Sequence, residues 1–238
     1  MANSYFEFKK FKIFHDKCGM KIGTDGVLLG AWADVEHDRR ILDIGSGSGL
    51  IALMVAQRNE QAMISGIDID PDAVEQANEN ASMTLWSDRL HFICQDVRQF
   101  KCEKNDMFDH LICNPPFYQD ALSSPDKKRN FARNTSVLPF DELIQGSTGL
   151  LRADGRFSVV LPAEIADEFI QLCWEYGLNL SRKTYVITKV GKSAKRVLLE
   201  FIKGRPDHYP AATYLTMKNE LGESTEEYRR LTDIFYIR

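Results

Sequence analysis

The stretch Asp43-Ile44-Gly45-Ser46-Gly47-Ser48-Gly49-Leu50 decides the fold of this 238-residue chain. It continues the short apolar run Ile41–Ile44, which is typical of a buried strand, and it leads into Leu50–Ala56, which has the character of a helix. Alternating glycines permit positive φ angles and let a ligand lie against bare backbone, while N–H groups at a helix start offer donors. The stretch therefore predicts a strand, a tight ligand-binding turn and a helix N-terminus.

The spacing of the glycines distinguishes this turn from other glycine-rich loops. It reads Gly45-x-Gly47-x-Gly49, not the G-x-G-x-x-G of a dinucleotide fold, and it lacks the Lys-Ser/Thr pair of a phosphate loop. Phosphate binding is therefore not favoured.

Carboxylates follow two further predicted strands. Met63–Asp68 ends in Asp68, where an acid could accept from both hydroxyls of a ribose. Leu90–Cys94 ends near Asp96, which is well placed to accept from an adenine amino group. The turn and these strand ends predict a cofactor site, for which the candidate residues are Thr24, Asp43, Gly45, Gly47, Gly49, Asp68, Ile69, Asp96, Val97 and Asn114.

The tetrapeptide Asn114-Pro115-Pro116-Phe117 follows a fourth predicted strand, Phe108–Cys113. Ligands gather outside the carboxyl ends of open parallel sheets, so the tetrapeptide should face the same cleft as the glycine turn. An exocyclic amine on adenine donates its lone pair into the ring and is a poor nucleophile. It must be held by acceptors that favour a more tetrahedral nitrogen.

The tetrapeptide has the groups that this chemistry requires. The side-chain oxygen of Asn114 and the carbonyl of Pro115 can accept the two hydrogens of the amine, and consecutive prolines stiffen the loop. Phe117 supplies a face on which a flat base can stack. We therefore predict Asn114, Pro115 and Phe117 as catalytic residues.

The motifs resemble those of class I S-adenosylmethionine-dependent methyltransferases, and the resemblance covers roughly Ile41 to Phe201. Asp43 with Gly45–Gly49 matches the family's first motif, Asp68 its ribose-binding acid and Asp96 the acid near the adenine. Asn114–Phe117 matches the tetrapeptide of enzymes that methylate planar amino nitrogens. The resemblance implies an α/β, Rossmann-like fold with a mostly parallel seven-stranded sheet, an antiparallel edge hairpin and helices on both faces. It also implies S-adenosylmethionine as the cofactor.

Within these methyltransferases the chain looks most like the bacterial enzymes that form N6-methyladenosine beside the anticodon of a valine tRNA. The supporting residues are Gly19–Gly26, Gly30-Ala31-Trp32, Asn114–Phe117 and Asn130-Phe131-Ala132-Arg133. This resemblance runs nearly the full length and implies adenine as the base and tRNA as the partner. The expected reaction is a direct in-line methyl transfer to an unpaired adenosine, because no cysteine or serine lies at the tetrapeptide to act as nucleophile.

Two other methyltransferase classes and a non-enzymatic module are alternatives. A protein-glutamine enzyme acting on release factors shares the tetrapeptide, because a carboxamide nitrogen is also planar, but such enzymes usually carry an N-terminal helical domain. An rRNA guanine-N2 enzyme tolerates Phe117 but usually carries an extra domain. A cofactor-binding or RNA-binding module without activity would predict erosion at Gly45, Asp68 or Asn114, and none is eroded.

Basic residues gather in two segments that could contact RNA. The segment Ser123–Asn134 is expected to be a basic loop beside the catalytic tetrapeptide, and the segment Arg182–Arg205 carries eight basic residues against the single acid Glu200. The formal net charge of -4 means that an RNA footprint must be a local patch. The candidate substrate-binding residues are Lys127, Lys128, Arg129, Arg133, Lys192, Lys195 and Arg196.

Length and composition indicate one methyltransferase domain over residues 1–238. We expect an N-terminal flap and helix at 1–35 that lie over the cofactor cleft, a Rossmann-like core at 36–205 and a C-terminal extension at 206–238. The flap should contain two short strands within Phe6–His15, and Thr24 or Asp25 should cap the following helix.

The remaining composition bounds the setting of the protein. No apolar run is long enough to span a bilayer, and the first residues lack the apolar region of a signal peptide, so we expect a cytoplasmic protein. Five cysteines are scattered singly, which argues against a disulfide framework or a metal site. The sequence does not fix the oligomeric state, and a monomer is favoured.

Overall fold

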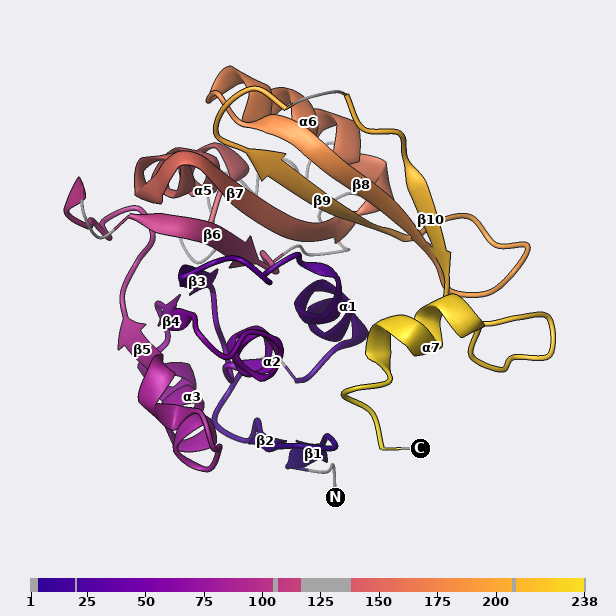
Figure 1. The fold of residues 1–238 in the computed structure, drawn as a ribbon, viewed down its shortest axis with the longest axis horizontal. Helices are drawn as coiled ribbons and strands as arrows, with labels where there is room; N and C mark the ends of the chain where they lie inside the picture. Colours follow the sequence, from indigo (N-terminus) through magenta and orange to yellow (C-terminus); the bar gives the residue numbers. More distant parts are fainter. Residues whose placement is uncertain (1–3, 20, 105–106, 117–137, 207–208, 238) are drawn as a thin grey trace, which may run out of the picture.

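A mixed sheet with the strand order β10-β8-β9-β7-β6-β3-β4-β5 forms the centre of the molecule (Figure 1). The computed structural model describes residues 4–19, 21–104, 107–116, 138–206 and 209–237. The sheet strands are β3 (Arg40–Ile44), β4 (Met63–Asp68), β5 (Leu90–Cys94), β6 (Phe108–Cys113), β7 (Leu151–Pro162), β8 (Asn179–Ile187), β9 (Arg196–Ile202) and β10 (Thr213–Thr216). The helices are α1 (Thr24–Trp32), α2 (Leu50–Arg58), α3 (Pro71–Ser82), α5 (Phe140–Leu150), α6 (Ala166–Glu175) and α7 (Glu226–Thr232), with short 3₁₀ turns at Ser87–Arg89 and Ala163–Ile165.

All strand pairs from β7 through β6, β3 and β4 to β5 are parallel, as the alternation of strands and helices predicts. The strand β9 runs antiparallel to both β7 and β8, which confirms the predicted hairpin. The hairpin does not form the edge of the sheet, however, because β10 pairs parallel with β8 and makes an eighth strand. The four residues of β10 carry no clear alternation, so the sequence did not predict this strand.

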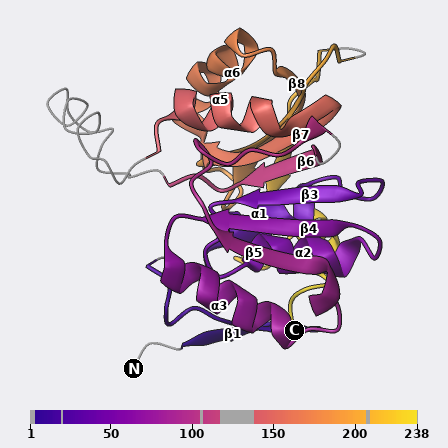
Figure 2. The same cartoon turned by 90° about the vertical axis from the view of Figure 1, so that its left-hand side faces the viewer.

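Side chains of the sheet alternate between two apolar cores. Leu111 and Val159 belong to the core beneath α5 and α6, whereas the next residues, Ile112 and Val160, belong to the core shared by α1, α2, α3 and α7. Figure 2 shows α5 and α6 beside β7 and β6, and α3 beside β5 and β4. Helices therefore cover both faces, as the Rossmann-like fold requires.

The N-terminal residues form the predicted pair of short strands. β1 (Tyr5–Glu7) and β2 (Lys12–Phe14) are antiparallel, and Phe8 bridges to Tyr236 near the other end of the chain. The predicted cap of the following helix is wrong, because Gly23 occupies the N-cap of α1 without a side-chain bond and Thr24 is already helical.

A buried polar network lies toward the amino ends of β3 and β6, away from the glycine turn. The imidazole of His110, which is fully buried, lies 2.9 Å from Asp38 Oδ2 through Nδ1 and 2.8 Å from Ser158 Oγ through Nε2. Burial alone would raise the pKa of Asp38, but its bonds to His110 and Arg156 outweigh burial and lower it. The network connects the segment that precedes β3, which contains Asp38, to β6 and β7.

We expect His110→Ala to lower the free energy of unfolding by about 3 kcal/mol, because the truncation removes the imidazole that bonds both Asp38 and Ser158 in a buried network and leaves a cavity in its place. Urea titration at neutral pH measures the change. His91→Ala, at an exposed histidine on β5, is the matched control and should alter stability by less than about 0.5 kcal/mol. Equal losses in both variants would contradict a stabilising role for the network.

Candidate active site

The three glycines of the turn all adopt positive φ angles. Gly45, Gly47 and Gly49 have φ values of 69°, 51° and 84°. A Cβ at Gly45 or Gly47 would have no heavy atom within 4 Å, whereas one at Gly49 would lie 3.0 Å from the ring of Phe92. The first two glycines therefore leave open space above the backbone, and the third lets α2 pack against β5.

The turn is held against the end of β4. The N–H groups of Gly45 and Ser46 donate to the carbonyl of Ile67 at 2.8 and 3.0 Å, and Gly47 donates to Asp68 Oδ2 at 2.8 Å. The second oxygen of Asp68 accepts from the N–H of Asp70 at 3.0 Å. Asp68 is thus fixed at the glycine turn, and each of its oxygens retains a further acceptor position.

Asp43 is buried directly beneath the turn. Its Oδ2 accepts from the N–H of Ala52 at 3.1 Å, but Oδ1 has no hydrogen-bond partner among the described residues, and neither has Ser46 Oγ. Burial raises the pKa of Asp43 to about 7, against the opposing bond from Ala52 and with a contribution from the negative charge of Asp68. A buried carboxylate with an unused oxygen is an acceptor that a cationic ligand would stabilise.

Strand register brings the tetrapeptide to the glycine turn. Ile44, the last residue of β3, pairs with Cys113, the last residue of β6. The next residues, Gly45 and Asn114, therefore leave neighbouring strands at the same level. Asn114 is half-buried and Pro115 is buried. Phe117, the last predicted catalytic residue, lies outside the described residues.

Asp96 lies at the third strand end, but its carboxylate is already held by Arg98. The Nε of Arg98 donates to both oxygens of Asp96 at 2.9 and 2.8 Å, and its Nη1 donates to Glu142 Oε2 at 3.1 Å. The side-chain bonds from Arg98 lower the pKa of Asp96. An adenine amino group at Asp96 would have to share the carboxylate with this guanidinium.

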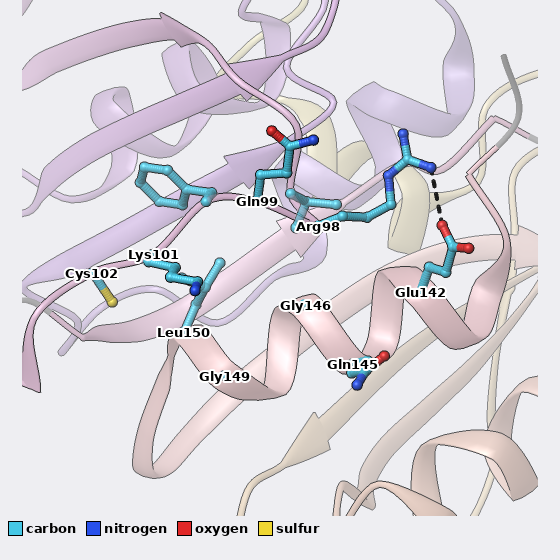
Figure 3. Close-up of a pocket in the computed structure, with 11 residues that line it drawn as sticks. Arg98, Gln99, Lys101, Cys102, Glu142, Gln145, Gly146, Gly149 and Leu150 are labelled. Atoms are coloured by element: carbon cyan, nitrogen blue, oxygen red, sulfur yellow. Dashed lines mark hydrogen bonds and ion pairs between the residues drawn. The ribbon is translucent and has the colours of Figure 1, made fainter. Parts of the chain in front are cut away.

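A cavity of about 840 Å³ adjoins this ion pair, between residues 97–102 and α5. Figure 3 shows Arg98 and Glu142 joined at one end of it and Lys101 with Cys102 at the other. Gly146 allows α5 to come close to the loop, because a Cβ there would lie 2.9 Å from the carbonyl of Val97. Val97 is buried, whereas Ile69, the other apolar residue of the predicted cofactor site, is 60% exposed.

Two amides that the sequence analysis missed hold the N-terminal segment beside the glycine turn. The side chain of Asn80, fully buried, accepts from the N–H of Phe14 and donates to the carbonyls of Phe14 and Ser48. Gln76 accepts from the N–H of Lys17. Both lie on the inner face of α3, where only the tertiary structure distinguishes a bridging amide from a surface one.

The segment that Asn80 holds reaches the carboxylates of the site. Burial, and then the charges of Asp68, Asp70 and Asp16, raise the pKa of Cys18 to about 11. Cys18 is therefore a protonated thiol at neutral pH.

The basic candidates differ in their environment. Lys192 and Lys195 are exposed on the turn between β8 and β9, whereas Arg196 donates from Nε to Asp25 Oδ2 at 2.8 Å and so ties β9 to the first turn of α1. Lys127, Lys128, Arg129 and Arg133 lie outside the described residues. Thr24 is exposed at the start of α1.

Two searches of the described residues bear on other classes of site. No helix in the described ranges is long and apolar enough to cross a membrane. Within the same ranges, no group of three or more His, Cys, Asp or Glu side chains is arranged to hold a metal ion.

The family model and the relatives that match this chain are all methyltransferases. The family model described as the methyltransferase small domain matches residues 19–172. A Phocaeicola vulgatus protein named tRNA1(Val) (adenine(37)-N6)-methyltransferase is 47% identical over 237 residues, which cover all of this chain and 99% of the relative. Proteins of the same name from Bacteroides fragilis and Yersinia pestis are 41% and 39% identical, with coverage of 100% and 98% of this chain and 100% and 93% of the relatives.

Solved structures share the fold at low sequence identity. A predicted O-methyltransferase from Agrobacterium tumefaciens has a TM-score of 0.63 at 21% identity and covers 88% of this chain and 96% of its own. The P. horikoshii TYW2 structure in complex with MeSAdo has a TM-score of 0.59 at 16% identity, with coverage of 83% and 70%. These likenesses show the methyltransferase fold.

We expect Asp43→Asn to stabilise the unliganded protein at pH 8. The pKa of Asp43 in the folded protein lies above its unfolded value, so the free energy of unfolding falls as pH rises from about 4 to 7 and the full penalty remains above pH 7. A shift of this size corresponds to a burial penalty of about 4 kcal/mol on the charged carboxylate. The neutral amide of asparagine removes that penalty, but as a buried group without a partner it costs about 2 kcal/mol itself. The expected gain at pH 8 is therefore about 2 kcal/mol, measured by urea unfolding.

Asp38→Asn is the matched control for this measurement. Asp38 is also a buried carboxylate, but its pKa is lowered by its partners, so the substitution should destabilise the protein at pH 5 and at pH 8. If Asp43→Asn lowered the free energy of unfolding at pH 8 by as much as at pH 5, the Asp43 carboxylate would not be under a burial penalty.

Proposed function

The chain belongs to the methyltransferase small domain family and, within it, to the tRNA1(Val) (adenine(37)-N6)-methyltransferases, and we propose that it methylates N6 of an unpaired adenosine in the anticodon loop of a valine tRNA. S-adenosylmethionine is the cofactor. The observation that carries the proposal is the pairing of Ile44 with Cys113, which places the glycine turn and Asn114 side by side at the carboxyl edge of the sheet.

The residues at this edge fit the cofactor. We assign Gly45 and Gly47 to the open backbone that the cofactor covers, and Asp68 to the ribose hydroxyls, for which its oxygens keep acceptor positions. The oxygen of Asp43 that has no hydrogen-bond partner in the described part of the chain suits the positive charge of the cofactor's amino acid part. We further assign Thr24, Gly49, Ile69, Asp96 and Val97 to the wall of the same site.

When bound, S-adenosylmethionine supplies an electrophilic methyl group on a sulfonium. Asn114 and Pro115 hold the target amine by accepting its two hydrogens, through the side-chain oxygen and the backbone carbonyl respectively. This arrangement directs the nitrogen lone pair out of conjugation and toward the cofactor side. The buried Pro115 fixes φ and keeps both acceptors in place. We assign Phe117 to stacking against the adenine ring.

The partner of the enzyme is tRNA, by the names of its full-length relatives. A flat base can reach Asn114 only if it is unpaired or turned out of a helix, which an anticodon loop provides. We propose that Lys192 and Lys195, with the basic residues of 127–133, contact phosphates, whereas Arg196 contributes through its pair with Asp25. We propose that the enzyme acts on tRNA in the cytoplasm, and we expect a monomer.

The test of this function is a labelling experiment. The protein is incubated with labelled S-adenosylmethionine and total tRNA from a strain that lacks its gene, and the labelled nucleoside is identified by mass. We expect N6-methyladenosine. Labelled N2-methylguanosine would leave the fold and the reaction type as proposed but would make guanine the substrate base. Label in a release factor under the same conditions, with none in RNA, would mean that the tetrapeptide binds a glutamine side chain.

Separate variants test the two parts of the site. Asn114→Ala should abolish turnover and leave the dissociation constant of the cofactor within about twofold, because Asn114 holds the amine. Asp68→Ala should weaken cofactor binding by about tenfold or more, as expected for the loss of a charge-assisted pair of hydrogen bonds. Isothermal titration with S-adenosylhomocysteine measures both constants. Equal weakening in the two variants would refute the division of roles.

A further inference from the structure

Two tyrosines stack on one another at the outer end of the sheet. Tyr214 on β10 pairs in register with Tyr185 on β8, and their ring centroids lie 5.6 Å apart with an interplanar angle of 23°. Tyr214 is 63% exposed, so one face of the stack is open to solvent. The next residues, Leu215 and Val186, are buried in the core of the opposite face. Both tyrosines therefore lie on the face that carries α5 and α6.

The strand that presents Tyr214 is held firmly. The hydroxyl groups of Thr184 and Thr213 lie 2.7 Å apart, and Thr213 Oγ1 also donates to the carbonyl of Lys183 at 3.2 Å. The indole N–H of Trp32 donates to Thr184 Oγ1 at 3.0 Å. The stack is thus preorganised, which lowers the entropy that a partner would lose on binding it.

Lysines lie beside the stack and on the turn that follows β8. The ammonium of Lys183 lies 4.9 Å from the centroid of the Tyr185 ring and 3.3 Å from Asp167 Oδ1. Lys189, Lys192 and Lys195 are exposed on the following turn, and no acidic residue occurs between Arg182 and Arg196. Figure 1 shows β10 beside β8 at the end of the sheet, next to the turn that leads into β9. Exposed aromatic faces among lysines are the chemistry of single-stranded nucleic acid binding.

The stack lies at the level of the catalytic edge. Tyr185 on β8 pairs with Val197 on β9, which pairs with Leu161 on β7. Cys113 on β6 pairs with Val159, which lies two residues before Leu161 on β7. Tyr185 is therefore level with the residue two positions beyond Cys113, which is Pro115. Four strand spacings separate β6 from β10, which corresponds to roughly 19 Å along the edge. About five or six stacked nucleotides span that distance, and fewer span it when the strand is extended.

We propose that Tyr214, supported by Tyr185, is a stacking platform for an unpaired base of the same tRNA, a few nucleotides from the methylated adenosine. The inference rests on the proposed function and adds a second, sequence-tolerant contact outside the catalytic site. Lys192 and Lys195 hold the backbone of that nucleotide stretch. The stack contributes to tRNA affinity and leaves cofactor binding and the chemical step unchanged.

Substitutions at Tyr214 distinguish stacking of a base on an aromatic ring from contact with any apolar side chain at this position. Tyr214→Ala and Tyr214→Leu should each raise the dissociation constant for tRNA by about tenfold, and Tyr214→Phe should stay within twofold of the wild type, because a base stacks on a phenyl ring but not on leucine. The affinity for S-adenosylhomocysteine and kcat at saturating tRNA should not change. Tyr209→Leu, at a tyrosine that is 77% exposed beside α6, is the matched control and should bind tRNA normally.

Salt dependence separates the tyrosine from the lysines. The Lys192→Ala, Lys195→Ala double variant should flatten the plot of log Kd against log salt by a slope of about 1.4, because two phosphate contacts are lost. Tyr214→Leu should leave that slope unchanged. A slope altered by Tyr214→Leu would assign the residue to an indirect, electrostatic effect and overturn the proposal.

A second arm identifies the contacted base. Anticodon stem–loops with a single abasic nucleotide at each loop position other than the target are titrated with wild type and Tyr214→Leu. At the contacted position the abasic substitution should weaken wild-type binding about tenfold and leave Tyr214→Leu with no further loss. A Tyr214→Leu variant that binds every RNA as tightly as wild type would overturn the inference while methylation of tRNA persists. Failure of the wild type to methylate tRNA would instead overturn the proposed function.

Discussion

The parallel register of β3 between β4 and β6 is the constraint on which the site depends. Ile44 pairs with Cys113 on one side and with Ile67 on the other, so three strands end at one level. The N–H groups of Gly45 and Ser46 then bond to Ile67, and the turn cannot shift without breaking the end of β4. A slip of one residue would turn Asn114 to the other face of the sheet. The register of the sheet therefore sets the relative position of the glycine turn and Asn114.

Burial of Asp43 at this edge disfavours the charged form of its carboxyl group. Asp43 is buried with one oxygen unpaired among the described residues, and burial raises its pKa to about 7. The Asp38 carboxylate at the other end of the strands is also buried, but His110 and Arg156 bond to it. The two buried carboxylates differ because Asp38 has charged partners and Asp43 has only the N–H of Ala52 among the described residues.

The outer strands extend the sheet beyond the parallel core. β10 lies outside the antiparallel hairpin, and its Tyr214 stacks on Tyr185. The pair between Arg196 and Asp25 joins the same hairpin to the start of α1, while Asn80 joins the N-terminal strands to the glycine turn. Segments that are distant in sequence are thereby tied to the two sides of the site.

By itself the sequence determined the glycine turn, the strands that end at Asp68 and Cys113, the Rossmann-like class and, through resemblance, the methyltransferase family. These are local patterns, since positive φ at alternating glycines and short apolar runs act over a few residues. It did not determine the eighth strand, the Gly23 cap of α1 or the amides Asn80 and Gln76. Only the tertiary structure decided the eighth strand and the two amides, because a partner distant in sequence selects among contacts that the local residues allow equally.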